Sequence, residues 1–350
     1  MSLTWTKLTG DLIKSASERR IPLAGSLELT ARCNLRCKMC YVCQSAGSKE
    51  AINSELTTAQ WIKLAEEIRD EGALFTTLTG GEVLLRKDFK EIYENITQLG
   101  MRVVVFTNGT LITPELAKWF GKIPPSRISI TLYGASEDTY EKVCGMGEGF
   151  NKVCRAIEEL LAEGITVEVK TTITKGNVQD YDKMVDIANG WGLKLGVIDY
   201  VSPRREGCYT DPLGNRLSAI EMAELVKRSN LENPYADEHI ADEIWKDSDG
   251  AFRCSVGKWG YWISYDGSLI PCGLLSEPVA YPLKTGFHQA WETLKDSCKT
   301  IPICGDCMTC PDLKYCSTCP ARLKAETGAF DKKATYLCEF TKESLQLSKS

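Results

Sequence analysis

The chain has 350 residues, 43% of them hydrophobic and 25% charged, and a formal net charge of -5 with the charged residues interspersed. This composition is typical of a globular protein with one large and one small domain, and it excludes the basic surface that nucleic-acid binding needs. The N-terminus lacks the apolar core of a signal peptide, and no stretch approaches the roughly 20 apolar residues of a membrane span. We therefore expect a cytoplasmic protein that binds neither nucleic acid nor membrane.

Between residues 26 and 201, short β-branched runs alternate with amphipathic stretches, the pattern of repeated βα units around a parallel sheet. The expected strands are Ser26–Thr30, Phe75–Thr79, Arg102–Thr107, Arg127–Leu132, Thr166–Thr172 and Lys194–Tyr200. The expected helices are Thr58–Asp70, Asp88–Leu99, Pro114–Phe120, Gly149–Ala162 and Asp180–Gly190. These units predict an α/β fold with a partial (β/α)6 TIM-like barrel, in which functional groups collect at the C-terminal ends of the strands.

The rest of the chain is less periodic. Residues 1–25 are expected as an N-terminal extension, and residues 202–250 as a connector with one helix near Leu217–Ser229. Residues 251–342 contain nine of the 16 cysteines and many turn signals, which predicts a small cysteine-rich α+β domain. Residues 343–350 are expected as a tail, the frayed end of a helix.

The cysteine content indicates metal binding, because cytosolic thiols are kept reduced and dense cysteine there seldom means disulfides. Histidine is scarce, since His239 and His288 are the two in the sequence. Clusters ligated by thiolates therefore fit better than sites that depend on imidazole. A disulfide framework and structural zinc sites are the alternatives.

Cys33, Cys37 and Cys40 follow the first expected strand in a C-x3-C-x2-C spacing. Three thiolates at this spacing can hold three corners of a [4Fe–4S] cube and leave the fourth iron without a protein ligand. The spacing, its place after the first strand and the flanking CNLRC resemble the radical S-adenosylmethionine (SAM) superfamily. The resemblance implies reductive cleavage of SAM to a 5′-deoxyadenosyl radical that abstracts a substrate hydrogen, and an electron donor of the flavodoxin or ferredoxin type.

The same resemblance implies which residues bind SAM. Gly80, Gly81 and Glu82 follow the second expected strand, where the family has a segment that meets the methionine amino group. Glycines allow close approach of the backbone, and a carboxylate accepts hydrogen bonds from an ammonium group. The other implied contacts of SAM are Met39, Asn108, Ser129, Thr131 and Lys170. The family often has an aromatic residue where Met39 stands, and Ser129, Thr131 or Lys170 could instead be an ordinary inward-facing barrel residue.

Seven C-terminal cysteines resemble, in order and spacing, the SPASM extension of peptide-modifying and protein-maturing members of the superfamily. The resemblance implies one auxiliary [4Fe–4S] cluster on Cys307, Cys310, Cys316 and Cys338. It implies a second on Cys254, Cys272 and Cys319, whose fourth ligand is missing or supplied by Cys208 or by the substrate. Two residues separate Cys316 from Cys319 where the family has three. Cys304 begins a ferredoxin-like run and is either a spare neighbour or an alternate ligand.

Four cysteines lie outside both sets: Cys43, Cys144, Cys154 and Cys298. Most of them are expected as small buried hydrophobic residues. An exposed cysteine near the barrel mouth, namely Cys43, Cys144 or Cys208, could instead return a hydrogen atom to a substrate radical, as in the peptide epimerases that the chain resembles.

Three classes of function are consistent with these features. The first is modification of a ribosomally synthesised peptide, by a thioether or carbon–carbon crosslink or by epimerisation, and residues 131–145 resemble a segment of such maturases. The second is dehydrogenation or decarboxylation of a protein side chain or a small-molecule biosynthetic intermediate. The third is a non-enzymatic electron-transfer or metal-binding protein, which would need no open iron. We expect the first, and the sequence leaves the substrate and the oligomeric state open.

Overall fold

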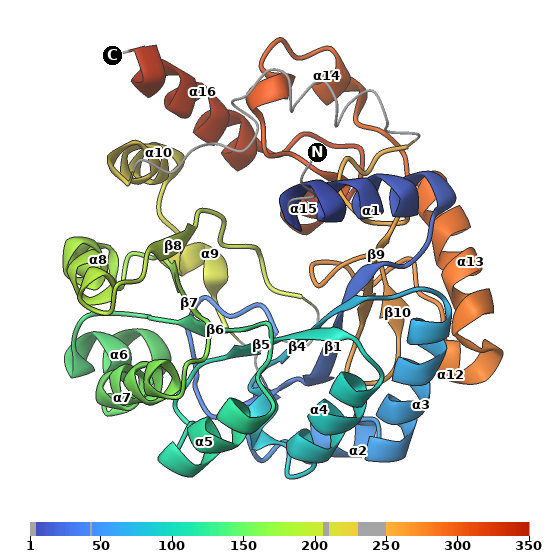
Figure 1. Cartoon of the computed structure of the whole chain (residues 1–350). Coiled ribbons are helices and arrows are strands. Elements are labelled where there is room, and N and C mark those ends of the chain that lie inside the picture. The colour runs from blue at the N-terminus through green and yellow to red at the C-terminus, as the bar shows by residue number, and fades with distance from the viewer. Residues whose placement is uncertain (1–4, 43, 206–209, 230–249, 350) are drawn as a thin grey trace.

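The computed structural model describes residues 5–42, 44–205, 210–229 and 250–349. Its centre is an eight-stranded sheet with the strand order β10-β9-β1-β4-β5-β6-β7-β8 (Figure 1). The strands are β1 (Ala24–Thr30), β4 (Phe75–Gly80), β5 (Arg102–Thr107), β6 (Arg127–Thr131), β7 (Val167–Thr172), β8 (Leu195–Ile198), β9 (Gly260–Ile263) and β10 (Leu269–Ile270). The short strands β2 (Arg32–Cys33) and β3 (Gln44–Ser45) form a second sheet.

The strands from β9 to β8 are all parallel, and β10 alone runs antiparallel, to β9. Parallel neighbours need crossover connections, which helices supply here. The crossover helices are α3 (Thr58–Asp70), α4 (Phe89–Gln98), α5 (Pro114–Lys122), α7 (Gly149–Ala162) and α8 (Tyr181–Gly190). The six expected βα strands and these five helices are confirmed, and every boundary lies within two residues of the expected one.

The sheet has one helix-covered face and one concave face. On β5, Val103 and Val105 are buried in the core, whereas Phe106 between Val105 and Thr107 is 36% exposed. Side chains alternate between the two faces of a strand, so the valines face the helices and Phe106 faces the concavity. The neighbouring strands follow the same alternation, which places Ser129 and Lys170 on the concave face.

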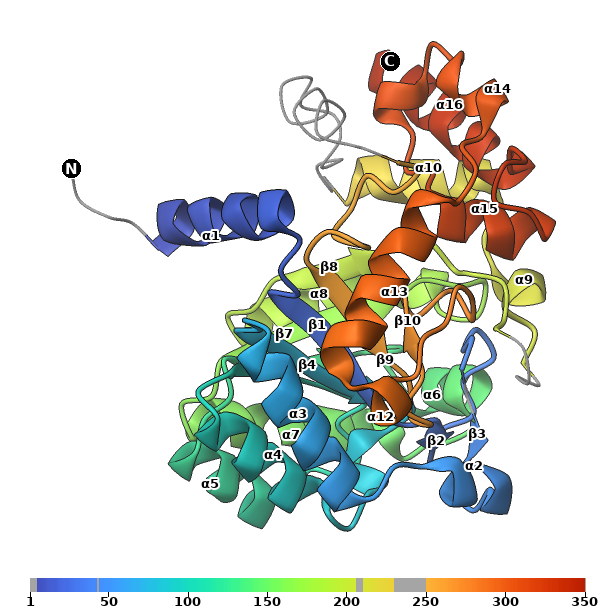
Figure 2. The same cartoon turned by 90° about the vertical axis from the view of Figure 1, so that its right-hand side faces the viewer.

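The remaining helices lie at the N-terminus, in the loops and in the C-terminal part. They are α1 (Trp5–Arg19), α2 (Lys49–Ser54), α6 (Glu137–Cys144), α9 (Pro212–Asn215), α10 (Ala219–Arg228), α12 (Pro282–Thr285), α13 (Phe287–Lys299), α14 (Gly305–Met308), α15 (Pro320–Thr327) and α16 (Thr335–Lys349). Single 3-10 turns occur at Val83–Leu85, Val178–Asp180 and Leu313–Tyr315. In Figure 2, α14, α15 and α16 gather at one end of the molecule, while α13 lies beside β9 and β10.

One feature was not expected from the sequence. Two strands of the C-terminal part extend the sheet beyond the six βα units, since β9 pairs with β1 from Ala24↔Gly260 to Leu27↔Ile263. Residues 343–349, expected as the end of a helix, form the last turns of α16, which packs on α10. No helix in the described residues has both the length and the apolar character to cross a membrane.

Candidate active site

The loop with Cys33, Cys37 and Cys40 leaves the C-terminal end of β1, and the end of β4 packs directly against it. The amide groups of Gly81 and Glu82 donate hydrogen bonds to the carbonyls of Thr30 and Arg32, at 2.7 and 2.8 Å. A Cβ atom at Gly80 would lie 2.2 Å from the Thr30 oxygen, and one at Gly81 would lie 2.3 Å from the Arg32 oxygen. Both positions therefore require glycine, because a side chain would push the cysteine loop away.

Glu82 is completely buried between the ends of β4 and β5. One carboxylate oxygen accepts hydrogen bonds from the Thr107 hydroxyl at 2.7 Å and the Leu84 amide at 3.0 Å. The other accepts from the Asn108 amide at 2.7 Å. Burial raises the pKa of Glu82, and these three donors oppose that rise. The orientation of the carboxylate is thus set by the protein itself.

Two nitrogen donors surround the sulfur of Cys33. The Leu35 amide donates to it at 3.4 Å, and the Asn108 side chain donates at 3.6 Å and also binds the Asn34 side-chain oxygen at 2.9 Å. Burial raises the pKa of Cys33, and Glu82, Cys37 and Cys40 raise it further by their charge. The three sulfurs therefore act on one another, and hydrogen-bond donors to sulfur are the usual surroundings of iron–sulfur ligands.

The middle of the cysteine loop is held against the C-terminal end of α6. The amide groups of Arg36 and Lys38 donate to the carbonyls of Cys144 and Val143, at 2.7 and 3.0 Å. This pairing sets Cys144 beside Cys37, and a hydrogen bond shared by the two thiols, together with burial, raises the pKa of Cys37.

Tyr133, which follows β6, also contacts this part of the loop. Its hydroxyl donates a hydrogen bond to the Cys37 sulfur, and this bond lowers the pKa of Cys37. Cys144 is fully buried, as expected for most of the four remaining cysteines. The alternative role of an exposed hydrogen donor is therefore wrong for Cys144, because the cysteine loop packs over it. The other two hydrogen-donor candidates, Cys43 and Cys208, lie outside the described residues.

The concave face brings together the polar residues expected near SAM. Lys170 on β7 forms an ion pair with Glu168 at 3.0 Å, and its ammonium group lies 4.9 Å from the ring centre of Phe106. Although partial burial acts in the opposite direction, the bond and charge of Lys170 lower the pKa of Glu168. Ser129 also binds Glu168, and Thr131 pairs with Lys170 in the strand register. Ser129, Thr131 and Lys170 thus share one patch of the inner sheet.

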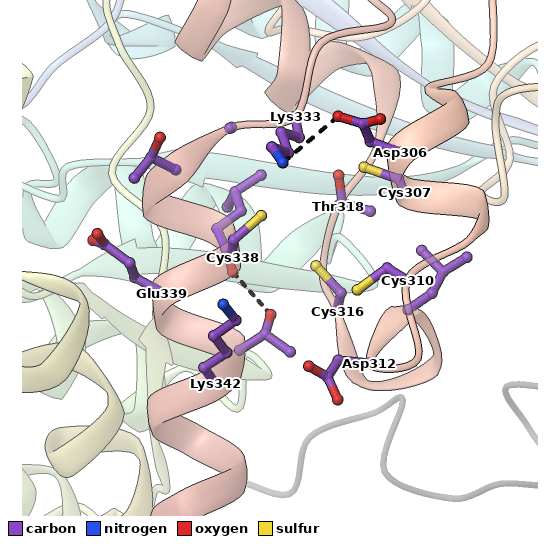
Figure 3. Close-up of a pocket in the computed structure, with 15 residues that line it drawn as sticks. Asp306, Cys307, Cys310, Asp312, Cys316, Thr318, Lys333, Cys338, Glu339 and Lys342 are labelled. Atoms are coloured by element: carbon purple, nitrogen blue, oxygen red, sulfur yellow. Dashed lines mark hydrogen bonds and ion pairs between the residues drawn. The ribbon is translucent and has the colours of Figure 1, made fainter.

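A separate cavity of about 430 Å³ lies between α14, the following loop and α16. The four cysteines expected for one auxiliary cluster line it: Cys307, Cys310, Cys316 and Cys338. In Figure 3, Cys338 on α16 faces Cys316 and Cys310 across this space. Burial, a hydrogen bond shared with Cys304, and the charges of Cys304, Cys316 and Cys338 raise the pKa of Cys307 to about 12.

The cysteines expected for the second auxiliary cluster, Cys254, Cys272 and Cys319, also lie near one another. Burial raises the pKa of Cys272 to about 12, and the nearby thiols Cys319 and Cys254 raise it further. Cys319 begins α15, where its sulfur accepts a hydrogen bond from the Arg322 amide at 3.4 Å. Cys304 is buried and lines a cavity of about 110 Å³ with Cys307 and Cys319, which places it between the two sets.

The donor chemistry of these sites fits iron–sulfur clusters. The raised thiol pKa values mean that a nearby positive charge, such as iron, is needed to hold these sulfurs as thiolates. In the part of the chain that the structure describes, no three His, Cys, Asp or Glu side chains are close enough to bind a single metal ion. A four-iron cube separates its cysteine sulfurs more widely than one ion does.

A buried ion pair that the sequence patterns did not predict lies beside the cysteine loop. Glu28, in the middle of β1, is 1% exposed, and both its oxygens accept from Arg205, at 2.7 and 3.1 Å. The indole nitrogen of Trp262 on β9 donates to the same carboxylate at 3.0 Å. The Arg205 amide also donates to the carbonyl of Tyr41, directly after Cys40, at 3.1 Å. One signal in the sequence could have revealed this pair. Glu28 stands between Leu27 and Leu29 in an expected strand, and a carboxylate buried there needs a charged partner.

Comparison with known proteins agrees with this geometry. Residues 27–189 match the family model of the radical SAM superfamily. The AdoMet-dependent heme synthase of Methanosarcina barkeri is 27% identical over 308 residues, which cover 80% of this chain and 86% of that protein. The antilisterial bacteriocin subtilosin biosynthesis protein AlbA of Bacillus subtilis is 26% identical over 290 residues, 81% of this chain but only 61% of AlbA.

Among solved structures, SuiB of Streptococcus suis bound to S-adenosylmethionine has the same fold. The TM-score is 0.69 at 14% identity, and the match covers 95% of this chain and 82% of SuiB. At this identity the likeness concerns the fold alone, and it includes the cysteine-rich C-terminal part as well as the barrel.

Proposed function

The chain belongs to the SPASM branch of the radical SAM superfamily, and we propose that this enzyme modifies a ribosomally synthesised peptide by a thioether or carbon–carbon crosslink or by epimerisation. Its cofactors are SAM, the [4Fe–4S] cluster that binds SAM, and one or two auxiliary [4Fe–4S] clusters. When bound, SAM and its cluster supply a 5′-deoxyadenosyl radical that abstracts a hydrogen atom from the substrate.

In this proposal, Cys33, Cys37 and Cys40 hold the cluster that binds SAM. The support is their shared electrostatic environment and the nitrogen donors around Cys33. Glu82 would accept hydrogen bonds from the methionine ammonium group, because its buried carboxylate is already oriented by Thr107 and Asn108.

The polar patch on the concave face would hold the rest of SAM. Ser129 or Thr131 would bind the ribose hydroxyls, and Lys170 would stand near the methionine carboxylate. Asn108 would act mainly on the cluster, since its side chain is already engaged with Cys33 and Asn34. Met39, which is buried in the cysteine loop, would contact adenine partly through its backbone.

The C-terminal cysteines would hold the auxiliary clusters. The cavity with Cys307, Cys310, Cys316 and Cys338 supports one of them. Cys254, Cys272 and Cys319 would hold a second, with Cys304, Cys208 or a substrate group as its fourth ligand. Auxiliary clusters of this kind give the enzyme a place to take up an electron from the substrate during crosslinking.

The observation that carries the choice of a peptide substrate is the likeness to AlbA. It extends over 81% of this chain, so it reaches beyond the barrel of residues 26–201. AlbA takes part in bacteriocin biosynthesis, which makes a peptide the favoured substrate class for this chain. Cys43 and Cys208 are the remaining candidates to return a hydrogen atom if the reaction is an epimerisation.

The likeness to the heme synthase favours a second candidate function. It covers 86% of that protein, so both chains have nearly the same extent. The chain would then oxidise or decarboxylate a small biosynthetic intermediate, such as an iron tetrapyrrole carboxylic acid.

Mass spectrometry after anaerobic turnover tests both proposals. The reconstituted full chain is incubated with SAM, a reductant and either short peptides encoded beside its gene or an iron tetrapyrrole carboxylic acid. Loss of a pair of hydrogen atoms from a peptide, or an unchanged mass with inverted stereochemistry, supports peptide modification. Loss of carbon dioxide from the tetrapyrrole supports the second candidate. The variant C37A is the control, and it should form no 5′-deoxyadenosine.

A further inference from the structure

A basic cavity borders the outer side of the cysteine loop. It has a volume of about 220 Å³, and three lysines from separate segments line it: Lys38 in the loop, Lys142 on α6 and Lys175 after β7. All three lysines are exposed, and Met39 forms part of the wall. The cavity therefore joins solvent to the chain segment between Cys37 and Cys40.

Two of the three lysines, Lys38 and Lys142, have no carboxylate paired with them within the described ranges. The acidic neighbour Glu141 is turned away, because its carboxylate accepts a hydrogen bond from the Gly147 amide at 2.8 Å. The ammonium group of Lys175 donates to the Gly214 carbonyl at 3.3 Å, which fixes its position. Glu221 is the nearby carboxylate, and hydrogen bonds from Ser218 together with the charge of Lys175 lower its pKa, but the two side chains form no ion pair in the described residues.

The backbone holds these lysines in place. The Lys38 amide donates to the Val143 carbonyl at 3.0 Å, and the Lys175 amide donates to the Asn215 carbonyl at 2.9 Å. Lys142 lies in the last turn of α6, where the helix dipole favours a cation. The cluster of positive charge is thus a built feature of the loop and of the two segments that pack on it.

We propose that this lysine cavity is the docking site of an acidic one-electron carrier protein, of the flavodoxin type, that reduces the cluster of the cysteine loop. The chain as a whole carries a net charge of -5, so an acidic carrier is repelled except where the surface is locally positive. Charge complementarity would steer the carrier to the cysteine loop, because Lys38 and Met39, which line the cavity, stand between the cluster ligands Cys37 and Cys40.

The step is a simple electron transfer. The reduced carrier loses one electron and the oxidised cluster gains it, and no bond forms or breaks. Complexes of this kind are small and short-lived, and a few lysines around one cavity suit them better than a large apolar face would. The inference rests on the proposed function only in requiring a cluster that accepts electrons.

Charge reversal away from the cluster ligands tests the proposal. The variant K142E/K175E changes the cavity, and K118E/K122E makes the same change in charge on the exposed side of α5. Anaerobically reconstituted chains are titrated with a purified acidic flavodoxin by calorimetry at low and high salt. We expect affinity to fall about tenfold or more for K142E/K175E at low salt, little for K118E/K122E, and strongly for the unmodified chain at high salt.

Reduction kinetics separate docking from catalysis. Cluster reduction by flavodoxin should slow in K142E/K175E, whereas dithionite, a small reductant, should reduce the cluster and drive SAM cleavage at the normal rate. Equal flavodoxin affinity in the two variants would overturn the proposal. If K142E/K175E bound flavodoxin normally but turned over slowly with dithionite, the proposal would also be overturned. The lysines would then bind an anionic group of the substrate. If the unmodified chain cleaves no SAM, the proposed function fails, and the titration still decides the docking site.

Discussion

Replacement of Arg205 by alanine should destabilise the protein strongly, because Glu28 would keep its charge without a partner. Glu28 is 1% exposed and the Arg205 side chain 13% exposed, so the pair is shielded from water. Removing one partner of a buried ion pair costs about 3–5 kcal/mol. At roughly 2 °C per kcal/mol for a protein of this size, the melting temperature should fall by about 6–10 °C. The Trp262 hydrogen bond alone cannot replace a bidentate guanidinium contact.

Thermal unfolding of the anaerobic holoprotein, followed by circular dichroism, measures this effect. The matched control is R69A, which removes an exposed ion pair with Asp70 and should change the melting temperature by about 2 °C or less. The double variant E28Q/R205A should recover part of the loss, because it leaves no buried charge. A melting temperature for R205A equal to that of R69A would refute the argument, since Glu28 would then not depend on its partner.

Three further predictions concern the cysteine loop. The variant E82Q should weaken SAM binding by about 10- to 150-fold, measured by equilibrium dialysis, because hydrogen bonds to charged groups contribute about 1.5–3 kcal/mol. Burial raises the folded-state pKa of Glu82, so its contribution to stability is present at low pH and lost as the pH rises through that pKa. The melting temperature of the cofactor-free chain should therefore fall with rising pH more steeply than that of E82Q, and parallel curves would contradict this. The variant C144A should lower the midpoint potential of the first cluster by about 40 mV in an EPR-monitored titration, because Cys37 as an iron-bound thiolate can only accept, and the bond of about 1 kcal/mol that the Cys144 thiol would donate to it is lost, whereas C154A should leave the potential unchanged.

The barrel could be predicted from the sequence because each unit carries its own local signals. The helix at Gly149–Ala162 was expected with the boundaries that the structure shows, and its apolar positions follow one face, where Val153, Ile157 and Leu160 are buried. The strand Arg102–Thr107 could be predicted just as directly, because most of its residues are β-branched. Local pattern sufficed for these elements because their packing partners are their neighbours in the chain.

The cysteine sets could be predicted from spacing, but the contacts that complete the site could not. The pairing of Arg36 and Lys38 with Cys144 and Val143 joins segments about a hundred residues apart, and nothing in either segment specifies the other. For the same reason the sequence left open whether Cys144 is a buried residue or an exposed hydrogen donor, and the structure shows it fully buried. A further role of the two glycines before Glu82 was also not predicted, since they make room for the cysteine loop.

The pairing of β9 with β1 has a consequence for how the two halves of the enzyme work together. The strand that carries Glu28 leads directly into the cysteine loop, and its other neighbour in the sheet, β9, comes from the cysteine-rich part of the chain. Trp262 on β9 and Arg205 in the connector both donate hydrogen bonds to Glu28. A displacement of the C-terminal part would therefore strain these bonds or displace β1. A buried, bidentate charge contact tolerates little displacement, because any gap leaves a charge unpaired. The distance between the first cluster and the auxiliary clusters would therefore be held by the sheet itself, and Arg205 is the residue whose loss should loosen it.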